Sequence, residues 1–361
     1  MAKLKIAVIF GGKSSEHDIS LVSAAHVIRS IRSDKYEVIS IGITKKGHWV
    51  RYIGPIGDIE SGNWEKHPDN VPCIMSPDTL HHGFITLNSD GTFDNIKVDC
   101  IFPVLHGKNG EDGTIQGLFQ LSGVPFVGCD MISSANCMDK EMTHIILEAN
   151  GIKMAKYISM RYSEMDMIDE KIKEAEAKLT YPMFVKPSCA GSSVGVSRVT
   201  NAKELKEGIK LAFLSDKKLL IEQGIVGIEC ECAVMGNTYP TASTVGEIKS
   251  ANEGFYDFES KYEDDSSETI IPARMSEENI EKIREQAIKA YKTIGCGGLA
   301  RCDFFLCENG EPVLNEINTM PGHTPISMYP KLMQHSGMSF EEQESKLISL
   351  ALERAEAWYE V

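Results

Sequence analysis

Four polar residues near the C-terminus have the types and spacing expected of a metal and phosphate site: Arg301, Asp303, Glu316 and Asn318. They lie on two apolar runs joined by a glycine-containing turn, which predicts a hairpin. Alternate residues of a strand share a face, so Glu316 and Asn318 point the same way and Asp303 can join them across the hairpin. Such oxygen donors suit Mg²⁺ bridging nucleotide phosphates. Arg301 shares a face with Asp303 and can neutralise developing negative charge.

A second segment suits an anion. Lys186 is followed by the small-residue run P-S-C-A-G-S-S-V-G, whose backbone N–H groups can approach a phosphate closely. Because the lysine precedes the glycines, the segment is not a Walker-type P-loop. Taken alone, a surface turn remains the alternative. Glu222 and Glu229 could similarly hold an adenine amino group and ribose hydroxyls, although an ordinary strand edge explains them equally well.

Two further charged segments follow apolar runs in the first third of the chain. Glu16 and His17 come just after Gly11-Gly12, and the run H-G-K-N-G-E-D-G occupies 106–113. The first can be a helix-capping carboxylate and the second a solvated turn. The density of glycine and charge at the end of a buried strand favours a site in the second case.

The elements that must position these residues follow from the hydrophobic pattern. Leu4–Phe10 is continuously apolar, as expected of a parallel strand covered on both faces, and Ser14 or Ser15 can cap the helix that follows it. A β-α-β beginning predicts a parallel sheet with sites beyond its strand ends. Residues 50–95 read as loops and short strands. Further strands are expected at 38–43, 98–104, 184–186, 219–222, 298–306 and 312–317, and helices at 132–150, 165–179, 202–214, 276–294 and 340–359.

Bulk composition excludes several classes of protein. A chain of 361 residues suggests two or three packed units. A net charge of −15 argues against a nucleic-acid or anionic-membrane partner. No stretch approaches the roughly 18 apolar residues of a membrane span, so we expect a cytoplasmic protein. The ten cysteines contain no C-x-x-C pair, which favours free thiols.

Seven segments in order resemble the D-alanine–D-alanine ligase family of the ATP-grasp superfamily. The segments are G-G-K-S-S-E-H at 11–17, H-G-K-N-G-E-D-G at 106–113, S-A-N-C-M-D-K at 134–140, K-P-x3-G-S-S-V-G at 186–195, F-Y-D-F-E-S-K-Y at 255–262, R-C-D-F-F at 301–305 and N-E-I-N-T-M-P-G at 315–322. The resemblance implies an α/β protein: an ATP-grasp fold preceded by a Rossmann-like parallel-sheet domain. The domains would be 1–130, a central ATP-grasp subdomain at 131–227 and a C-terminal one at 228–361. It also implies ATP, two Mg²⁺ ions that Mn²⁺ can replace, D-alanine as substrate and a homodimer.

The resemblance also implies a role for each matching position. ATP would be bound by Lys140, Lys186, Ser192, Ser193, Glu222, Gln223, Ile225, Glu229 and Asn315, with the lysines at the phosphates. Asp303, Glu316 and Asn318 would hold the metal. Glu16 would bind the first ammonium, positioned by Ser192 and Tyr262, with His106 near that substrate's carboxylate. Lys261 and Tyr262 would lie on a closing loop. Arg301 and the Gly322 N–H would stabilise an oxyanion, and Ser327 would receive the second carboxylate beside Met328.

The second substrate is the open question at this point. Vancomycin-resistance relatives join D-alanine to D-serine or D-lactate, and the 106–113 segment and V-G-C-D at 127–130 resemble that branch. Tyr262 stands where D-lactate ligases place histidine, and Met328 where resistance ligases typically carry arginine. These two residues favour D-alanine over D-serine. Gln120, Gln223 and Cys189-Ala190 depart from the family pattern without removing a required group. Another ATP-grasp ligase and a non-catalytic ATP sensor are the rival interpretations.

Overall fold

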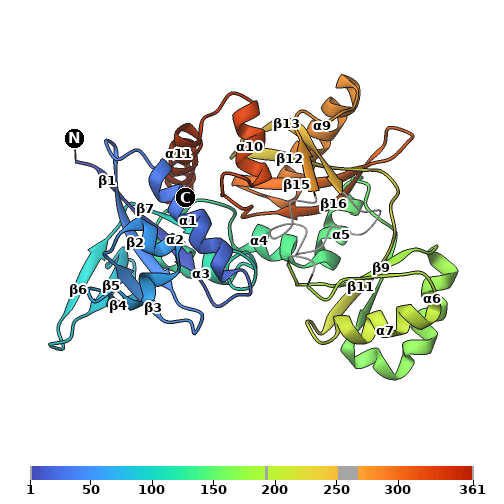
Figure 1. Cartoon of the computed structure of the whole chain (residues 1–361), viewed down its shortest axis with the longest axis horizontal. Helices are drawn as coiled ribbons and strands as arrows, with labels where there is room; N and C mark the ends of the chain where they lie inside the picture. The colour runs from blue at the N-terminus through green and yellow to red at the C-terminus, as the bar shows by residue number, and fades with distance from the viewer. Residues whose placement is uncertain (1, 192–193, 251–266, 360–361) are drawn as a thin grey trace.

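The computed structural model describes residues 2–191, 194–250 and 267–359, which form three sheets (Figure 1). The first sheet has the strand order β6-β5-β4-β3-β2-β1-β7. One end of this sheet is parallel: β1 (Leu4–Gly11) pairs with β2 (Tyr36–Ile43) and with the edge strand β7 (Cys100–Val104). The remaining strands are antiparallel: β3 (Trp49–Tyr52), β4 (Val71–Met75), β5 (Gly83–Leu87) and β6 (Phe93–Lys97). The expected β-α-β beginning is present, and the expected parallel arrangement is limited to these three strands.

The helix after β1 begins later than its sequence suggested. Helix α1 (His17–Ser30) has Glu16 as its N-cap residue, and no side chain makes the capping hydrogen bond. Ser14 Oγ instead accepts from the Glu16 N–H at 3.1 Å, so it shapes the turn that carries Glu16. The remaining helical elements of this unit are α2 (Ile56–Glu60), η1 (Asn63–Lys66) and α3 (Thr114–Ser122).

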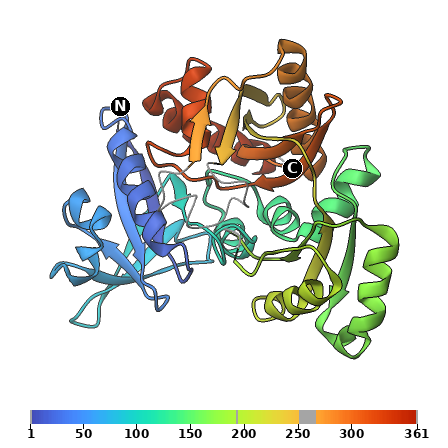
Figure 2. The same cartoon turned by 45° about the vertical axis from the view of Figure 1, so that its right-hand side comes forward.

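Two helices, α4 (Met131–Met138) and α5 (Lys140–Ala149), run from the N-terminal unit towards the other sheets (Figures 1 and 2). One helix over 132–150 was expected, and this expectation was wrong. The backbone of Asp139 is extended, and its carboxylate accepts a hydrogen bond from the Met142 N–H at 3.3 Å as the N-cap of α5. The break makes Lys140 the first residue of a new helix.

The central four-stranded sheet has the order β10-β9-β11-β8, and its helices pack against each other and against the strands. Its antiparallel core is β8 (Tyr157–Arg161), β9 (Met183–Pro187) and β11 (Lys218–Gln223), with β10 (Ser197–Val199) at the edge. Helices η2 (Tyr162–Met167), α6 (Ile168–Lys178) and α7 (Ala202–Ala212) complete this unit. Lys186 and Glu222 therefore stand on adjacent strands.

The third sheet has the order β14-β13-β12-β15-β16, and all of its pairs are antiparallel. The strands are β12 (Ile228–Gly236), β13 (Thr241–Ser250), β14 (Ser267–Ile270), β15 (Gly298–Leu306) and β16 (Pro312–Asn318). Cys230, Cys232 and Val234 face a core beneath α9 (Glu277–Ile294), and the alternate residues face the opposite side. Over Glu229–Cys232 the alternation thus points the two cysteines to the core and the two glutamates to the opposite face.

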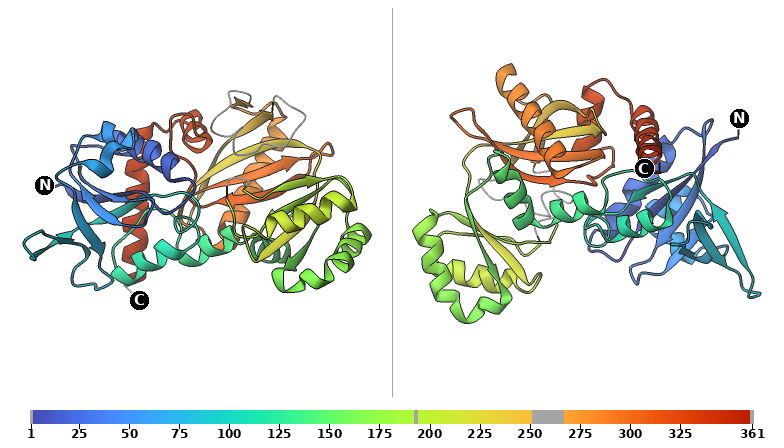
Figure 3. Two further views of the ribbon diagram at one scale, coloured as in Figure 1. Left: turned by 60° about the horizontal axis from the view of Figure 1, so that its bottom comes forward. Right: turned by 180° about the vertical axis from the view of Figure 1, so that it is seen from behind.

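Helix α10 (Met328–His335) covers β12 and β13, and α11 (Phe340–Tyr359) lies against the N-terminal unit (Figure 3). One core cluster contains residues from both ends of the chain, including Ile6, Val8 and Phe10 from β1 and Leu347 and Ile348 from α11. The guanidinium of Arg354 donates to the carbonyl oxygens of Gly128 at 2.6 Å and Phe126 at 2.8 Å. The last helix therefore joins the first sheet to the third.

Each sheet falls within one of the residue ranges expected as domains, and the division at 130 and 227 stays a prediction. Within the described ranges, none of the helices has the length and apolar character that crossing a membrane requires.

Glu344 yields a stability prediction. It is fully buried on α11, neither carboxylate oxygen has a hydrogen-bond partner among the described residues, and burial raises its pKa to about 8. Between about pH 5 and pH 8 the unfolded chain ionises this group while the folded protein keeps the proton. Native stability should therefore fall as pH rises through this window, by up to about 1.4 kcal/mol per pH unit.

Glu344→Gln removes this dependence. In urea denaturation at pH 5 to 8, the variant should gain stability relative to the native chain as pH increases, with little difference at pH 5. The exposed Glu341→Gln on the same helix is the control. Parallel pH profiles for native protein and Glu344→Gln would contradict the prediction.

Candidate active site

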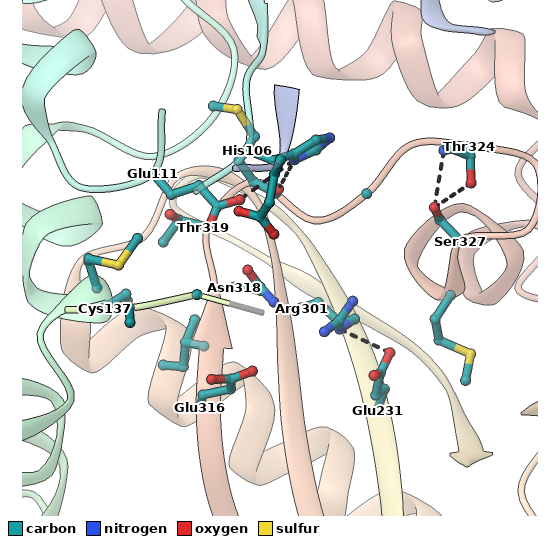
Figure 4. A pocket seen from close by; sticks show the side chains of 18 of the residues that line it. His106, Glu111, Cys137, Glu231, Arg301, Glu316, Asn318, Thr319, Thr324 and Ser327 are labelled. Atoms are coloured by element: carbon teal, nitrogen blue, oxygen red, sulfur yellow. Dashed lines mark hydrogen bonds and ion pairs between the residues drawn. The ribbon is translucent and has the colours of Figure 1, made fainter. Parts of the chain in front are cut away.

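One pocket lies where the three units meet, and it is lined by polar side chains from all of them (Figure 4). The first unit contributes Glu16 and His106, and helices α4 and α5 contribute Cys137 and Lys140. The remaining lining residues that matter here are Gly191, Glu231, Ile248, Arg301, Glu316, Asn318, Gly322, Thr324, Ser327 and Met328. Segments far apart in sequence thus surround one polar site.

A row of residues crosses the third sheet beneath this pocket. Gly246 on β13 pairs with Glu231 on β12, Glu231 with Asp303 on β15, and Asp303 with Glu316 on β16. Directly paired residues of antiparallel strands project to the same face. Three carboxylates therefore stand side by side on the pocket face of the sheet.

Arg301 lies between two of these carboxylates. Its guanidinium makes two hydrogen bonds of 2.8 Å to Asp303, and its Nε lies 2.9 Å from Glu231 Oε2. Burial opposes its charge, but the neighbouring Asp303 and Glu231 hold the pKa of Arg301 well above its ordinary value. The cation is thus fixed in charge and in orientation, with bidentate geometry that only an arginine can make.

The donor set fits a hard divalent cation. Glu316 and Asn318 line the pocket, and Asp303 faces Glu316 directly across β15 and β16. Among the described residues no cluster of three or more His, Cys, Asp or Glu side chains is placed as a self-sufficient metal site. Two carboxylates and one amide oxygen suit a cation that completes its shell with phosphate oxygens and water.

Two lysines approach the site from the central sheet and α5. Lys140 Nζ donates to the Ala190 carbonyl at 2.8 Å and lies 4.0 Å from Glu316 Oε2. Lys186 Nζ lies 2.6 Å from Glu222 Oε2 and 3.1 Å from Asn315 Oδ1. Both amines thus stand beside oxygen acceptors of the protein.

Glu222 is fully buried between Lys186 and His144, whose Nε2 lies 3.1 Å from Glu222 Oε1. Burial raises the pKa of this carboxyl, but the charges and hydrogen bonds of Lys186 and His144 outweigh burial and lower it to about 2. Glu222 is therefore ionised and holds Lys186 at a fixed position.

A network of ion pairs fixes the start of α5, where Lys140 is the first residue. Lys218 Nζ lies 2.6 Å from Asp139 Oδ2 and 2.9 Å from Glu141 Oε2, and Asp139 also accepts from Ser188 Oγ at 2.8 Å. The Lys140 N–H donates to the Ser188 carbonyl at 3.0 Å. The start of α5 is thus joined to the loop after β9, so Lys140 and that loop are held in register.

Glu16, buried at the start of α1, faces the 106–113 loop and the loop after β9. A side chain at Gly107 would collide with its carboxylate, and one at Gly191 would lie 3.6 Å from it. His106 Nδ1 lies 3.2 Å from the Met320 carbonyl and 3.6 Å from Glu111 Oε1. Burial lowers the pKa of His106, but Glu111 and then Glu16 raise it above its ordinary value. His106 and Glu111 are thus paired in the pocket, and the Glu16 carboxylate lines the same pocket.

The N-terminus of α10 also lines the pocket. Ser327 is its N-cap residue, and Ser327 Oγ lies 2.7 Å from Thr324 Oγ1 and accepts from the Thr324 N–H at 3.1 Å. A side chain at Gly322 would meet Ser327 Oγ at 2.8 Å, so a glycine leaves that hydroxyl accessible. A helix N-terminus, with a hydroxyl and the backbone N–H groups of its first turn, is suited to a carboxylate.

Most of the residues expected from the sequence gather at this site. Those lining the pocket are Glu16, His106, Lys140, Arg301, Glu316, Asn318, Gly322, Ser327 and Met328. Asp303, Lys186, Glu222 and Asn315 lie beside it through the contacts above, whereas Gln223, Ile225 and Glu229 lie near the β11–β12 connection and do not line the pocket. Ser192, Ser193, Lys261 and Tyr262 lie outside the described residues.

Two site residues were missed by sequence reasoning. Glu231 shares a strand face with Glu229, and the alternation E-C-E-C-A-V could have marked it as pointing away from the core. Glu111 follows His106 by five residues within a segment already recognised as a candidate site. The sequence does not show that Glu231 pairs with Arg301, or that Glu111 pairs with His106.

Comparison with known proteins gives a consistent result. The family model described as D-ala D-ala ligase N-terminus matches residues 5–129, and that described as D-ala D-ala ligase C-terminus matches residues 146–349. A D-alanine–D-alanine ligase from Ruminiclostridium cellulolyticum is 48% identical, over 99% of this chain and 97% of its own length.

Solved structures agree with the sequence relatives. The VanG D-Ala:D-Ser ligase from Enterococcus faecalis is 42% identical with a TM-score of 0.89, covering 97% of this chain and 100% of the other. The D-alanine–D-alanine ligase from Coxiella burnetii is 32% identical with a TM-score of 0.87, covering 100% and 97%. These likenesses confirm the α/β ATP-grasp fold class. With sequence identity approaching one half over nearly its whole length and both family models matched in order, the chain belongs to the D-alanine–D-alanine ligase family.

Proposed function

We propose that this enzyme uses ATP to join two D-alanines into D-alanyl-D-alanine for peptidoglycan synthesis. The observation that carries the proposal is one pocket lined by the Glu16 carboxylate, by the N-terminus of α10 and by the charged row of the third sheet. Two amino acids placed head to tail across this pocket would bring one carboxyl group near the amine of the other, above Arg301. Proximity of this kind supplies much of a ligase's rate enhancement.

The reaction needs no covalent enzyme intermediate. The carboxylate of the first D-alanine attacks the γ-phosphorus of ATP, giving an acyl phosphate and ADP. The amine of the second D-alanine then attacks the acyl carbon, a proton is lost from nitrogen, and the tetrahedral intermediate expels inorganic phosphate. Cys137 lines the pocket but is not required as a nucleophile in either step.

The first substrate would lie on the side of the pocket that the N-terminal unit forms. Glu16 would accept hydrogen bonds from its ammonium, and His106, oriented by Glu111, would lie near its carboxylate. Ser192, Tyr262 and Lys261 belong to this proposal through the family motifs, Tyr262 and Lys261 as parts of a loop that excludes water from the acyl phosphate.

ATP would bind between the central and third sheets. Lys140, Lys186 and the loop after β9, including Ser192 and Ser193, would contact phosphates, and Glu222, Gln223, Ile225, Glu229 and Asn315 would surround the nucleoside and adjacent phosphates. Two Mg²⁺ ions, replaceable by Mn²⁺, would be held by Asp303, Glu316 and Asn318. When bound, they supply neutralisation of phosphate charge. Arg301 and the Gly322 N–H would stabilise the oxyanion.

The second substrate would lie at the start of α10, with its carboxylate on Ser327 and its side chain beside Met328. An apolar thioether suits the methyl of D-alanine but has no group to bind a hydroxyl. This favours D-alanine over the D-serine of the structurally similar VanG enzyme. The proposal further includes a cytoplasmic homodimer with three domains at 1–130, 131–227 and 228–361.

Product identification tests the function directly. Purified enzyme is given ATP, Mg²⁺ and D-alanine alone, or with D-serine or D-lactate, and phosphate release and product mass are measured. D-Alanyl-D-alanine should be the main product in every mixture. A mixed product as the main species would assign the enzyme to the resistance branch, and ATP binding without turnover would support a sensor.

Glu316→Gln tests the metal role. Loss of one carboxylate should raise the Mg²⁺ concentration needed for half-maximal turnover by about tenfold or more, while excess Mg²⁺ restores part of the activity. Glu308→Gln, an exposed residue on the same hairpin, is the matched control. Undiminished turnover of the variant at limiting Mg²⁺ would refute the assignment.

Met328→Arg tests the second subsite. A guanidinium in place of the thioether offers donors to a substrate hydroxyl, so the ratio of D-serine to D-alanine incorporation should rise roughly tenfold. Met167→Arg, at an exposed site elsewhere, adds the same charge as a control. An unchanged D-serine to D-alanine ratio would show that Met328 does not contact the second substrate.

A further inference from the structure

The charged row on the third sheet ends at a residue without a side chain. Glu316, Asp303 and Glu231 each project from this row, and the fourth position, on β13, is Gly246. Ile248, two residues further along β13, lines the pocket on the same face. Gly246 is therefore a gap in the pocket face of the sheet.

The side chain of Met328 fills this gap. A Cβ added to Gly246 would lie 2.9 Å from Met328 Sδ and 3.2 Å from its Cε, and 3.1 Å from Leu332 Cδ2. Met328 is only 6% exposed, yet it lines the pocket between Ser327 and the sheet. Its thioether thus lies directly against the backbone of β13.

The backbone of Gly246 does not require glycine, because its φ lies outside the left-handed region. The residue sits in a paired stretch of β13, opposite Glu231, where any L-residue can adopt the conformation. Glycine inside a strand is usually unfavourable. What requires glycine at this position is the space occupied by Met328.

The direction in which Met328 can move is also constrained. Leu332 and the core formed with Ala233 and Met235 lie on its inner side, and the pocket lies on the other. A methyl group at position 246 would collide with the flexible end of Met328 rather than with backbone. The thioether would consequently move towards the pocket.

We propose that Gly246, which does not touch substrate, is a positioning residue that sets the depth of the second-substrate subsite through Met328. The inference rests on the proposed function, because it assigns a specificity role within that subsite. By leaving Met328 flat against β13, Gly246 allows room for a small D-amino-acid side chain. Adding a methyl group makes this end of the pocket shallower.

Gly246→Ala should raise the apparent KM for the second D-alanine by roughly tenfold, the effect of about one methylene in an apolar pocket. The apparent KM values for ATP and the first D-alanine should stay within about twofold of native, because their groups lie elsewhere in the pocket. Incorporation of the larger D-serine should fall further than that of D-alanine. A general loss of stability would instead lower kcat without separating the two substrates.

Met328→Ala provides the decisive comparison. Removal of the thioether leaves room for the methyl group that Gly246→Ala adds. Introducing Gly246→Ala into Met328→Ala should therefore change the apparent KM for the second D-alanine by no more than about twofold. The same tenfold increase in both backgrounds, or a native second KM in folded Gly246→Ala, would overturn the proposal. If Gly246→Ala alone does not fold, the double variant is compared with Met328→Ala. A folded double variant with the same KM for the second D-alanine as Met328→Ala supports the contact. A different KM overturns the proposal.

Gly117→Ala is the matched control. A Cβ at this glycine would meet another methionine, Met131, at an ordinary 3.6 Å, in a helix away from the pocket, and should leave both KM values unchanged. The native enzyme assayed in parallel separates the two claims. Absence of D-alanyl-D-alanine from native enzyme rejects the proposed function, whereas an active native enzyme with a silent Gly246→Ala rejects only the role of Gly246.

Discussion

The site depends on keeping one buried guanidinium between two carboxylates. An isolated buried charge is costly, so Arg301 is tolerated only because Asp303 and Glu231 are fixed beside it by the pairing of β12 with β15. The same pairing places Asp303 opposite Glu316, which leaves net negative charge at the edge nearest Lys140. The register of four strands therefore decides where a cation and a phosphate can bind. A slip of one residue would turn the whole row into the α9 core.

Much of the fold and of the candidate site could be predicted where the sequence pattern was confined to neighbouring residues. Leu4–Phe10 is continuously apolar and ends at two glycines, so its identity as a buried strand needed no partner. The hairpin that carries Arg301 and Glu316 was similarly evident from two apolar runs around a turn. The family segments then located most of the pocket, because each is a contiguous run of residues with unusual composition.

Features that depend on distant partners were not predictable. The break at Asp139 was missed because an aspartate within an amphipathic pattern is commonly tolerated; its capping bond from Met142 is local, but the contacts with Ser188 and Lys218 that fix it come from the central sheet. Strand β13 has a mixed polar sequence, so neither its existence nor the pairing of Gly246 with Glu231 followed from periodicity. Register across a sheet is set by tertiary packing, and a single sequence does not contain it in readable form.

The position of α11 has a consequence for how the chain is made. The core beneath β1 is completed by Leu347 and Ile348, which are synthesised almost a whole chain length after Ile6. During translation α1 can pack on β1 early, but the part of this cluster beside β7 stays uncovered until α11 follows. Loop closure of this length is slow, and exposed apolar strands are prone to aggregation in the interval. The joining of the chain's two ends therefore leaves part of the apolar surface of the N-terminal unit exposed until synthesis is nearly complete.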